Sequence, residues 1–247
     1  MTLTESEVND TVFTIRICEL NIEIDNRYDY VEDQCRAYLS DGAPAFRVSV
    51  TEAETAAYIE TCGRPMTAPE AESALLYRKI CGKMPDYDAI LLHAAVLTMD
   101  GRGYAFSARR GTGKTTHVAM WKQAYGDRVT VVNGDKPLVR RAPDGHFRVY
   151  GTPWCGKEGE NANLCCPLNA ICFLEQGPRN VMLPCPAADT VSRILEGTIL
   201  PPDPRTQDRM AELVGALTRD IPAFLLYCIP DKSAAELACA TMLQVRN

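Results

Sequence analysis

The first third of the chain alternates between hydrophobic and polar positions with the two-residue period of a β-strand. This alternation predicts three short strands, at residues 13–17, 22–24 and 46–50. Between the second and the third strand, apolar residues recur at helical spacing over residues 31–39. Thr67 and Glu70 then form a capping box, which predicts a helix from there to about Ile80. The first part of the chain is therefore predicted to be a small α+β unit.

Longer apolar runs dominate the remainder of the chain. They predict strands at residues 90–97, 104–107, 128–132, 170–174 and 224–228. Helical patterns occupy residues 117–124, 187–197 and 206–219, and the capping pattern from Ser233 to Glu236 predicts a last helix. Asp144 and Gly145 mark a hairpin between strands at 137–141 and 146–150. We expect an α/β domain over residues 86–247, preceded by an N-terminal α+β extension over residues 1–85.

A further hairpin is predicted between the strand at 90–97 and the strand at 104–107. Its turn signal is the run Asp-Gly-Arg-Gly at residues 100–103. If the turn is centred between residues 100 and 102, the numbers of residues that pair across it add up to about 201–203. His93 is then expected to face residues 108–110.

Residues 108–116 read Ala-Arg-Arg-Gly-Thr-Gly-Lys-Thr-Thr, which is a Walker A phosphate loop except that Ala108 replaces its first glycine. A short apolar strand precedes the loop and a helical pattern follows it, as this motif requires. Backbone N–H groups in such a loop cradle phosphates, and the N-terminal end of the helix attracts negative charge. The residues predicted to bind nucleotide are Gly111, Thr112, Gly113, Lys114, Thr115 and Thr116.

The chemistry of phosphoryl transfer assigns further roles. Lys114 is expected to reach the β- and γ-phosphates, and the Thr115 hydroxyl to ligate Mg²⁺. Asp135 closes an apolar strand one crossover after the loop, which makes it the candidate for the acidic metal ligand or the base. The hairpin geometry gives His93 a role near the transferred phosphate, although a histidine in an apolar run is also typical of a core. His117 and His146 are expected to be structural or on the surface.

Four residues are weaker candidates for a substrate site: Lys136, Trp154, Gly156 and Lys157. Lys136 is expected to pair with Asp135 or to touch phosphate. Lys157 lies in a loop bracketed by glycines, where it would suit an anion. Trp154 either lines the pocket or anchors the loop by packing.

Composition narrows the classes of partner. The formal net charge is −6 and the sequence pI is about 5.2, so we do not expect a nucleic-acid partner. There is no block of like charge and no apolar run long enough to cross a bilayer, and the first residues are polar and acidic. We therefore expect a cytoplasmic protein without a membrane partner. None of the 11 cysteines forms a C-x-x-C pair, which favours reduced cysteines that fill the core.

From His93 to Thr115 the chain resembles the catalytic domain of HPr kinase/phosphorylase. His93, Gly101, Gly103 and the run Gly113-Lys114-Thr115 fall at the spacing of that family. The loop is also similar to that of ATP-dependent phosphoenolpyruvate carboxykinases. The runs at 133–137 and 151–157 resemble small HPr-kinase-related proteins, some of which phosphorylate serines of peptides. The resemblance covers residues 85–245 and is strongest from 90 to 160.

The resemblance implies an α/β P-loop fold of the HPr kinase/phosphoenolpyruvate carboxykinase type, with a mixed central sheet. It implies a kinase that uses ATP and Mg²⁺ to phosphorylate a hydroxyl of a peptide, a protein or a small molecule, with Asp135, His93 and Lys114 as catalytic residues. Bacterial HPr kinases carry paired acids where this chain reads Gly134-Asp135, so either Asp135 serves both metal and base or His93 assists it.

Two alternatives remain open at this stage. One is a carboxykinase-like enzyme, which would need a second metal constellation of Lys and His. The other is a non-enzymatic nucleotide-binding regulator, which the glycine at position 134 would permit. The partners expected are a nucleotide, an unidentified acceptor that bears a hydroxyl group and, as a further option, a second copy of the chain.

Overall fold

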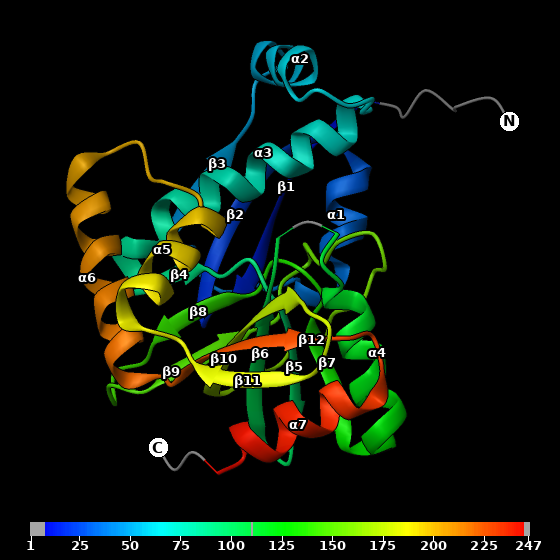
Figure 1. The fold of residues 1–247 in the computed structure, drawn as a ribbon. Helices are drawn as coiled ribbons and strands as arrows, with labels where there is room; N and C mark the ends of the chain where they lie inside the picture. Colours follow the sequence, from blue (N-terminus) through cyan, green and yellow to red (C-terminus); the bar gives the residue numbers. More distant parts are fainter. Residues whose placement is uncertain (1–7, 110, 245–247) are drawn as a thin grey trace, which may run out of the picture. The chain divides into compact units, whose positions relative to one another are not determined.

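The computed structural model describes residues 8–109 and 111–244 of the chain. It divides into two compact units, Met1–Lys83 and Met84–Asn247, which we call the N-terminal and the C-terminal unit (Figure 1). Both units mix helices and strands. Within the described residues, no helix has the length and apolar character that crossing a bilayer demands.

The N-terminal unit has the following elements: β1 (Val8–Ile17), β2 (Leu20–Tyr28), α1 (Asp29–Cys35), a 3-10 turn (Arg36–Tyr38), β3 (Phe46–Ser49), α2 (Glu52–Thr61) and α3 (Ala68–Lys83). Its three strands form one sheet in the order β1-β2-β3, antiparallel between β1 and β2 and parallel between β2 and β3. Ile15, Ile22 and Ile24 on these strands are fully buried. Helices α1 and α3 both contact β2, so the alternation in the sequence does reflect a sheet with one covered face.

The C-terminal unit opens with a 3-10 turn (Met84–Tyr87). Its first half contains β4 (Ala89–Leu91), β5 (Ala95–Met99), β6 (Arg102–Ser107), α4 (Lys114–Tyr125), a 3-10 turn (Gly126–Arg128), β7 (Val129–Asn133), β8 (Leu138–Arg141) and β9 (Phe147–Tyr150). Its second half contains β10 (Cys165–Gln176), β11 (Val181–Pro184), α5 (Ala187–Gly197), α6 (Pro204–Asp220), β12 (Ala223–Cys228) and α7 (Lys232–Met242).

The strands of this unit form a mixed sheet in the order β4-β8-β9-β10-β6-β5-β7, with β12 beside β10 and β11 at the edge. The long strand β10 pairs with β9 through its first residues and with β6 and β12 through the others. Its pairings with β6 and β12 are parallel, and the other pairings of the sheet are antiparallel. The fold class is therefore α/β with a mixed sheet, as expected.

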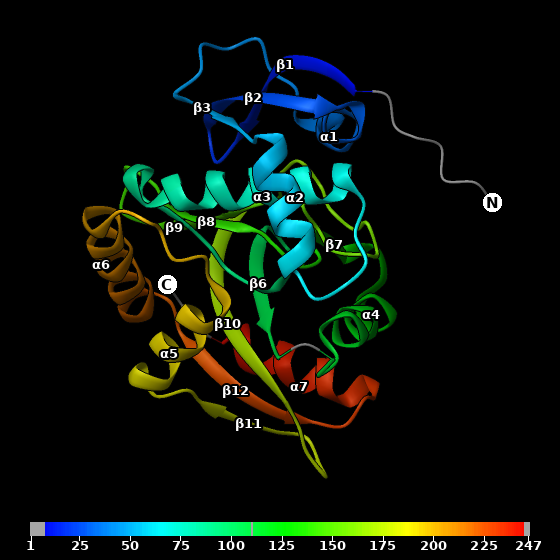
Figure 2. The same ribbon diagram turned by 90° about the horizontal axis from the view of Figure 1, so that it is seen from above.

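Helices cover the two faces of this sheet in pairs. Helices α4 and α7 pack on one face around Tyr104, Phe106 and Trp121, whereas α5 and α6 pack on the other around Phe173 and Leu217 (Figure 2). Burial of these side chains is the main favourable contribution to folding, at about 1.5–3 kcal/mol for each large apolar side chain. The layers hold the strand ends, and the loops that follow them, in fixed positions.

The predicted hairpin at residues 100–103 is confirmed. Met99 pairs with Arg102 and Ala95 with Phe106, so the paired numbers add up to 201, because 99 + 102 and 95 + 106 both give that sum. Asp100 and Gly101 form the two-residue turn with positive φ angles of 52° and 76°, the geometry that a tight hairpin requires.

Two expectations about elements were wrong, and two elements were missed. The strand expected at 90–97 is two strands, because the chain bends at residues 92–94 and β4 pairs with β8 whereas β5 pairs with β6 and β7. The last helix is capped by Asp231, whose carboxylate accepts a hydrogen bond from the Ser233 N–H, and not by Ser233 itself. Helix α2 and strand β11 were not predicted, although Thr51 and Glu54 form a capping box at the start of α2.

Candidate functional site

The loop between β6 and α4 contains two glycines in the left-handed backbone region. Gly111 and Gly113 adopt positive φ angles of 82° and 107°, which glycine reaches without strain. Gly113 precedes the first residue of α4 and its carbonyl accepts the His117 N–H at 2.9 Å. The N–H groups of the first helical turn therefore remain available to an anion. Arg110 lies outside the described residues.

Ala108, which stands in place of the first glycine of the motif, does not adopt a positive φ. It is 9% exposed and packs in the core beneath α4 and α7. A methyl group is tolerated at this position because the backbone there does not require glycine. The departure from the motif is explained by the local conformation.

Lys114, His93 and Asp135 lie together at the mouth of the loop. The Lys114 Nζ atom is 2.7 Å from His93 Nε2, and His93 Nε2 is 3.1 Å from Asp135 Oδ1. The third side of the triangle, from Lys114 Nζ to Asp135 Oδ1, measures 3.4 Å. The three side chains come from the start of α4, the bend before β5 and the turn after β7, so the fold gathers the three residues predicted to be catalytic.

The electrostatics of the triangle follow from its partial burial. Burial lowers the pKa of Lys114, although the carboxylate of Asp135 opposes this effect. Burial on its own would raise the pKa of Asp135, but the hydrogen bond with His93 and the positive charges of Lys114 and Lys136 outweigh it, so this pKa is lowered. Asp135 is therefore ionised at neutral pH and able to accept a proton or bind a cation.

Asn133, the last residue of β7, organises the turn that carries Asp135. Its side chain is fully buried, and its Oδ1 atom accepts the N–H groups of Asp135 at 2.9 Å and Lys136 at 2.7 Å. Its Nδ2 group donates to the carbonyls of Thr152 at 3.0 Å and Trp154 at 3.2 Å. The sequence prediction missed Asn133, although an Asn followed two residues later by Asp is typical of an Asx turn.

Residues 151–162, which we call the 151–162 loop, lie against this turn. Ala162 N–H donates to the Val132 carbonyl at 3.1 Å and Gly134 N–H to the Glu160 carbonyl at 2.9 Å. The Thr152 hydroxyl donates to the Lys136 carbonyl at 2.9 Å. These bonds hold the loop along the end of β7 and beside Asp135.

Two glycines allow the close approach of loop and turn. A Cβ atom on Gly134 would lie 2.9 Å from the Cys155 carbonyl oxygen, which is closer than side chains tolerate. A Cβ atom on Gly156 would lie 3.1 Å from the Cβ atom of Asp135, and Gly156 also has a positive φ of 86°. The absence of a second acid at position 134 is thus explained by packing.

The four weaker substrate candidates separate into two groups. Lys136 and Gly156 lie next to Asp135, since Lys136 follows it in the turn and Gly156 packs against it. Trp154 is only 4% exposed and is part of the packed base of the loop, whereas Lys157 is exposed at its tip. The 151–162 loop therefore places its backbone at Gly156 beside Asp135 and carries the exposed cation of Lys157, whereas the indole ring of Trp154 is buried.

The two other histidines lie outside this arrangement. His117 is 1% exposed, its Nε2 atom accepts a hydrogen bond from Trp121 Nε1 at 3.1 Å, and burial lowers its pKa to about 4. His146 is exposed in the turn between β8 and β9. Among the residues that the structure describes, no three His, Cys, Asp or Glu side chains form a metal-binding cluster. A magnesium site at this loop would accordingly depend on Thr115, Asp135 and phosphate oxygens.

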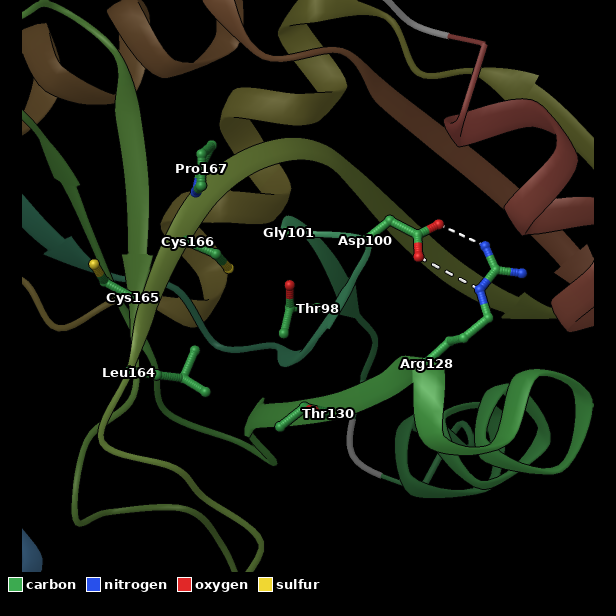
Figure 3. A pocket seen from close by; sticks show the side chains of 9 residues that line it. All are labelled: Thr98, Asp100, Gly101, Arg128, Thr130, Leu164, Cys165, Cys166 and Pro167. Atoms are coloured by element: carbon green, nitrogen blue, oxygen red, sulfur yellow. Dashed lines mark hydrogen bonds and ion pairs between the residues drawn. The ribbon is translucent and has the colours of Figure 1, made fainter.

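An open cavity of about 370 Å³ lies elsewhere in the C-terminal unit. Figure 3 shows its lining, which includes Thr98, Thr130, Cys165 and the ion pair between Asp100 and Arg128. Asp100 and Arg128 lie at the opposite ends of β6 and β7 from the phosphate loop and Asp135. None of the predicted site residues lines this cavity. The triangle is the stronger candidate because it combines charge, partial burial and backbone donors, whereas the side chains of the Asp100–Arg128 pair are more than half exposed.

Comparisons with known proteins add little. No protein-family model matches the chain, and a search of curated proteins finds no match. Among solved structures, the chain is similar to the Hpr(Ser) kinase/phosphatase from Coxiella burnetii, with 11% sequence identity and a TM-score of 0.33. The similarity covers 62% of this chain and 98% of that one. At this level it is too distant to assign the chain to a family.

Proposed function

We propose that the protein is an ATP-dependent kinase that transfers the γ-phosphate to a hydroxyl group of a peptide, a protein or a small molecule. The observation that carries the proposal is the triangle of Lys114, His93 and Asp135 at the mouth of a glycine loop with two positive φ angles. A cation and an ionised carboxylate beside a helix N-terminus are groups that phosphoryl transfer uses, and a histidine next to them can take part in proton transfer.

Lys114 is the group that neutralises phosphate charge. In the structure its ammonium group contacts His93 and Asp135, and its side chain is 12% exposed. When a nucleotide occupies the loop, we expect this ammonium to turn to the β- and γ-phosphates, where it stabilises the charge that develops on transfer. Thr115 and Asp135 are the residues that would hold Mg²⁺, which supplies further neutralisation of phosphate charge when bound.

Asp135 accepts the proton of the acceptor hydroxyl. The hydroxyl oxygen forms a bond to the γ-phosphorus, the bond from that phosphorus to the β,γ-bridging oxygen breaks, and the proton passes to the carboxylate. ADP leaves with the electron pair of the broken bond. His93, 3.1 Å from Asp135, orients the carboxylate and adds a donor near the transferred group.

The Lys114→Ala substitution tests the proposal. We expect phosphoryl transfer from radiolabelled ATP to a serine- and threonine-containing peptide library to fall by more than about 100-fold, and the affinity for ADP to fall as well. Lys232→Ala, an exposed lysine that pairs with Glu236 on α7, is the matched control and should behave as the wild type. Unchanged transfer in Lys114→Ala would reject the assignment. Tight ATP binding by the wild type without transfer to any acceptor would favour a nucleotide-binding regulator instead.

A further inference from the structure

His93 occupies a bend whose backbone is held from two sides. The Leu92 N–H donates to the Pro137 carbonyl at 3.2 Å. The Ser107 hydroxyl donates to the His93 carbonyl at 2.9 Å, which ties the bend to the end of β6. These bonds fix the position of the His93 Cα atom. They do not by themselves fix the rotamer of its imidazole, which is 34% exposed.

The C-terminal end of α5 lies beside the base of the His93 side chain. A Cβ atom on Gly197, the last residue of α5, would lie 2.8 Å from the Cβ atom of His93 and 3.7 Å from its Cγ and Nδ1 atoms. The next residue, Thr198, donates from its hydroxyl to the Leu91 carbonyl at 2.9 Å, just before the bend. The helix end is thus bonded to the strand that leads into His93.

Helix α5 is itself well anchored. Thr190 and Ile194 are 1% and 2% exposed and belong to the core side of the helix. Arg193 forms an ion pair with Glu175 of β10 at 2.8 Å and lies over the Phe173 ring. Because these contacts fix the helix on the sheet, the position of Gly197 is fixed as well. The His93 side chain therefore has Gly197 near its Cβ atom and Lys114 and Asp135 near its Nε2 atom.

We propose that Gly197 is a positioning residue for His93: because it has no side chain, the end of α5 can lie close to the base of the His93 side chain and direct its Nε2 atom toward Lys114 and Asp135. The role in catalysis rests on the proposed kinase function, but the contact itself does not. A small displacement of a catalytic group is costly, since a misplacement of about 1 Å can reduce turnover by about 100-fold.

The Gly197→Ala substitution tests this role. Its methyl group cannot fit beside His93 without a shift of the histidine, so kcat should fall by about tenfold to 100-fold, while the KM for ATP stays within about twofold because the loop at residues 111–116 is untouched. Gly215→Ala in α6 is the matched control, because a Cβ atom there meets only the flexible guanidinium of Arg219, at 3.5 Å. That variant should keep the wild-type kcat.

Two further measurements separate positioning from general destabilisation. In the background of His93→Gln, Gly197→Ala should cost no additional activity, since both changes remove the same oriented imidazole. In NMR spectra of protein with labelled histidine, Gly197→Ala should shift the His93 resonance, identified by its loss in His93→Gln, and leave those of His117 and His146 in place.

The outcomes distinguish this inference from the proposed function. If Gly197→Ala leaves both kcat and the His93 resonance unchanged, the inference is wrong. If the wild type transfers no phosphate, the kinase proposal fails, and the NMR shift alone still decides whether Gly197 holds His93. Should Gly197→Ala not fold, Thr198→Val provides the second test, because loss of its bond to Leu91 should move the same resonance and lower kcat several-fold. An unmoved resonance in Thr198→Val would then overturn the inference.

Discussion

At the scale of single residues, the candidate site depends on one nitrogen atom with two neighbours. His93 Nε2 is within hydrogen-bond distance of both Lys114 Nζ and Asp135 Oδ1. A ring nitrogen can accept a hydrogen bond from the ammonium or donate one to the carboxylate, but it cannot do both at once. Asp135 balances the charge of Lys114 in either case. The side chain that we propose to bind phosphate is therefore held by an acid in this structure.

This balance predicts an unusual response to Asp135→Asn. Removal of the carboxylate frees Lys114 and also removes a negative charge that would repel a bound phosphate. This repulsion is large, since two unit charges 4 Å apart interact by as much as about 4 kcal/mol near a protein surface. ADP should therefore bind several-fold more tightly to the variant in EDTA, whereas Mg²⁺-dependent transfer should fall by more than about tenfold. Calorimetric titration with and without Mg²⁺ measures the first effect.

The exposed Asp144, which pairs with Arg148 in the hairpin turn, supplies the control variant Asp144→Asn. Neither quantity should change in it. Activity of Asp135→Asn within about tenfold of the wild type, roughly 1.4 kcal/mol of barrier, would reject a catalytic role for this carboxylate.

His117 gives a prediction about stability at the same scale. Burial lowers its folded-state pKa to about 4, below the value of about 6.5 expected for an unfolded chain. Between these values the unfolded chain takes up a proton that the folded chain does not, so stability is complete above pH 6.5 and declines as the pH falls toward 4. At pH 5 the loss should be about 2 kcal/mol.

Urea denaturation at pH 7 and pH 5 measures this loss, and His117→Gln isolates it from the titration of carboxyl groups. The glutamine does not titrate, and its carbonyl can accept the Trp121 N–H that His117 accepts in the wild type. The pH-dependent loss should be about 2 kcal/mol smaller in the variant. An equal loss in both proteins would show that His117 is protonated in the folded state.

At the scale of elements, the sequence predicts local structure well, but it predicts contacts between residues far apart in the chain poorly. The hairpin at 100–103, the helix after the glycine loop and the start of α3 at Thr67 all depend on residues within a few positions of one another. The packing of Gly197 on His93 joins positions 104 residues apart (197 − 93), and no periodicity reports such a contact. The same holds for Asn133 and Thr152, whose bond is visible only once the 151–162 loop has folded back.

The split of the strand at 90–97 has a similar cause. Apolar residues flank the bend on both sides, since Leu92 and Ala94 next to His93 are both buried. A continuous apolar run carries no signal for a change of pairing partner. His93 is the one polar residue within the run. A histidine at such a position is as readily explained by a functional role as by a break in the strand.

The crowded turn after β7 predicts what happens when an acid is introduced at position 134. In Gly134→Asp the new Cβ atom would lie 2.9 Å from the Cys155 carbonyl oxygen and 3.4 Å from that of Glu160, both of them backbone atoms that cannot rotate away. We expect this variant to lose stability by about 1–3 kcal/mol and to lose activity as the 151–162 loop moves off Asp135. Thermal unfolding and the transfer assay measure the two effects.

Gly145→Ala controls for the loss of a glycine in a turn, because a Cβ atom there meets nothing within 4 Å although its φ is 85°. It should cost stability through backbone strain but keep the kcat of the folded protein. A gain of activity in Gly134→Asp would show that the site lacks its base, and would favour a regulator that has lost catalysis over an active kinase.

At the scale of the whole molecule, every residue of the triangle, the glycine loop and the 151–162 loop belongs to the C-terminal unit. A ligand that binds only the folded state at 100 times its Kd stabilises that state by about 2.7 kcal/mol, which lowers the population of locally open states about 100-fold where the ligand is held. Hydrogen exchange with a non-hydrolysable ATP analogue and Mg²⁺ should therefore slow at residues 111–117 and 133–136, and to a smaller extent at 91–94. Peptides from residues 8–83 should exchange as before.

The Lys114→Ala variant, treated with the same analogue, should show no slowing in any of these segments. Slower exchange in residues 8–83 that depends on Lys114 would contradict the assignment, because it would show that the N-terminal unit takes part in holding the nucleotide.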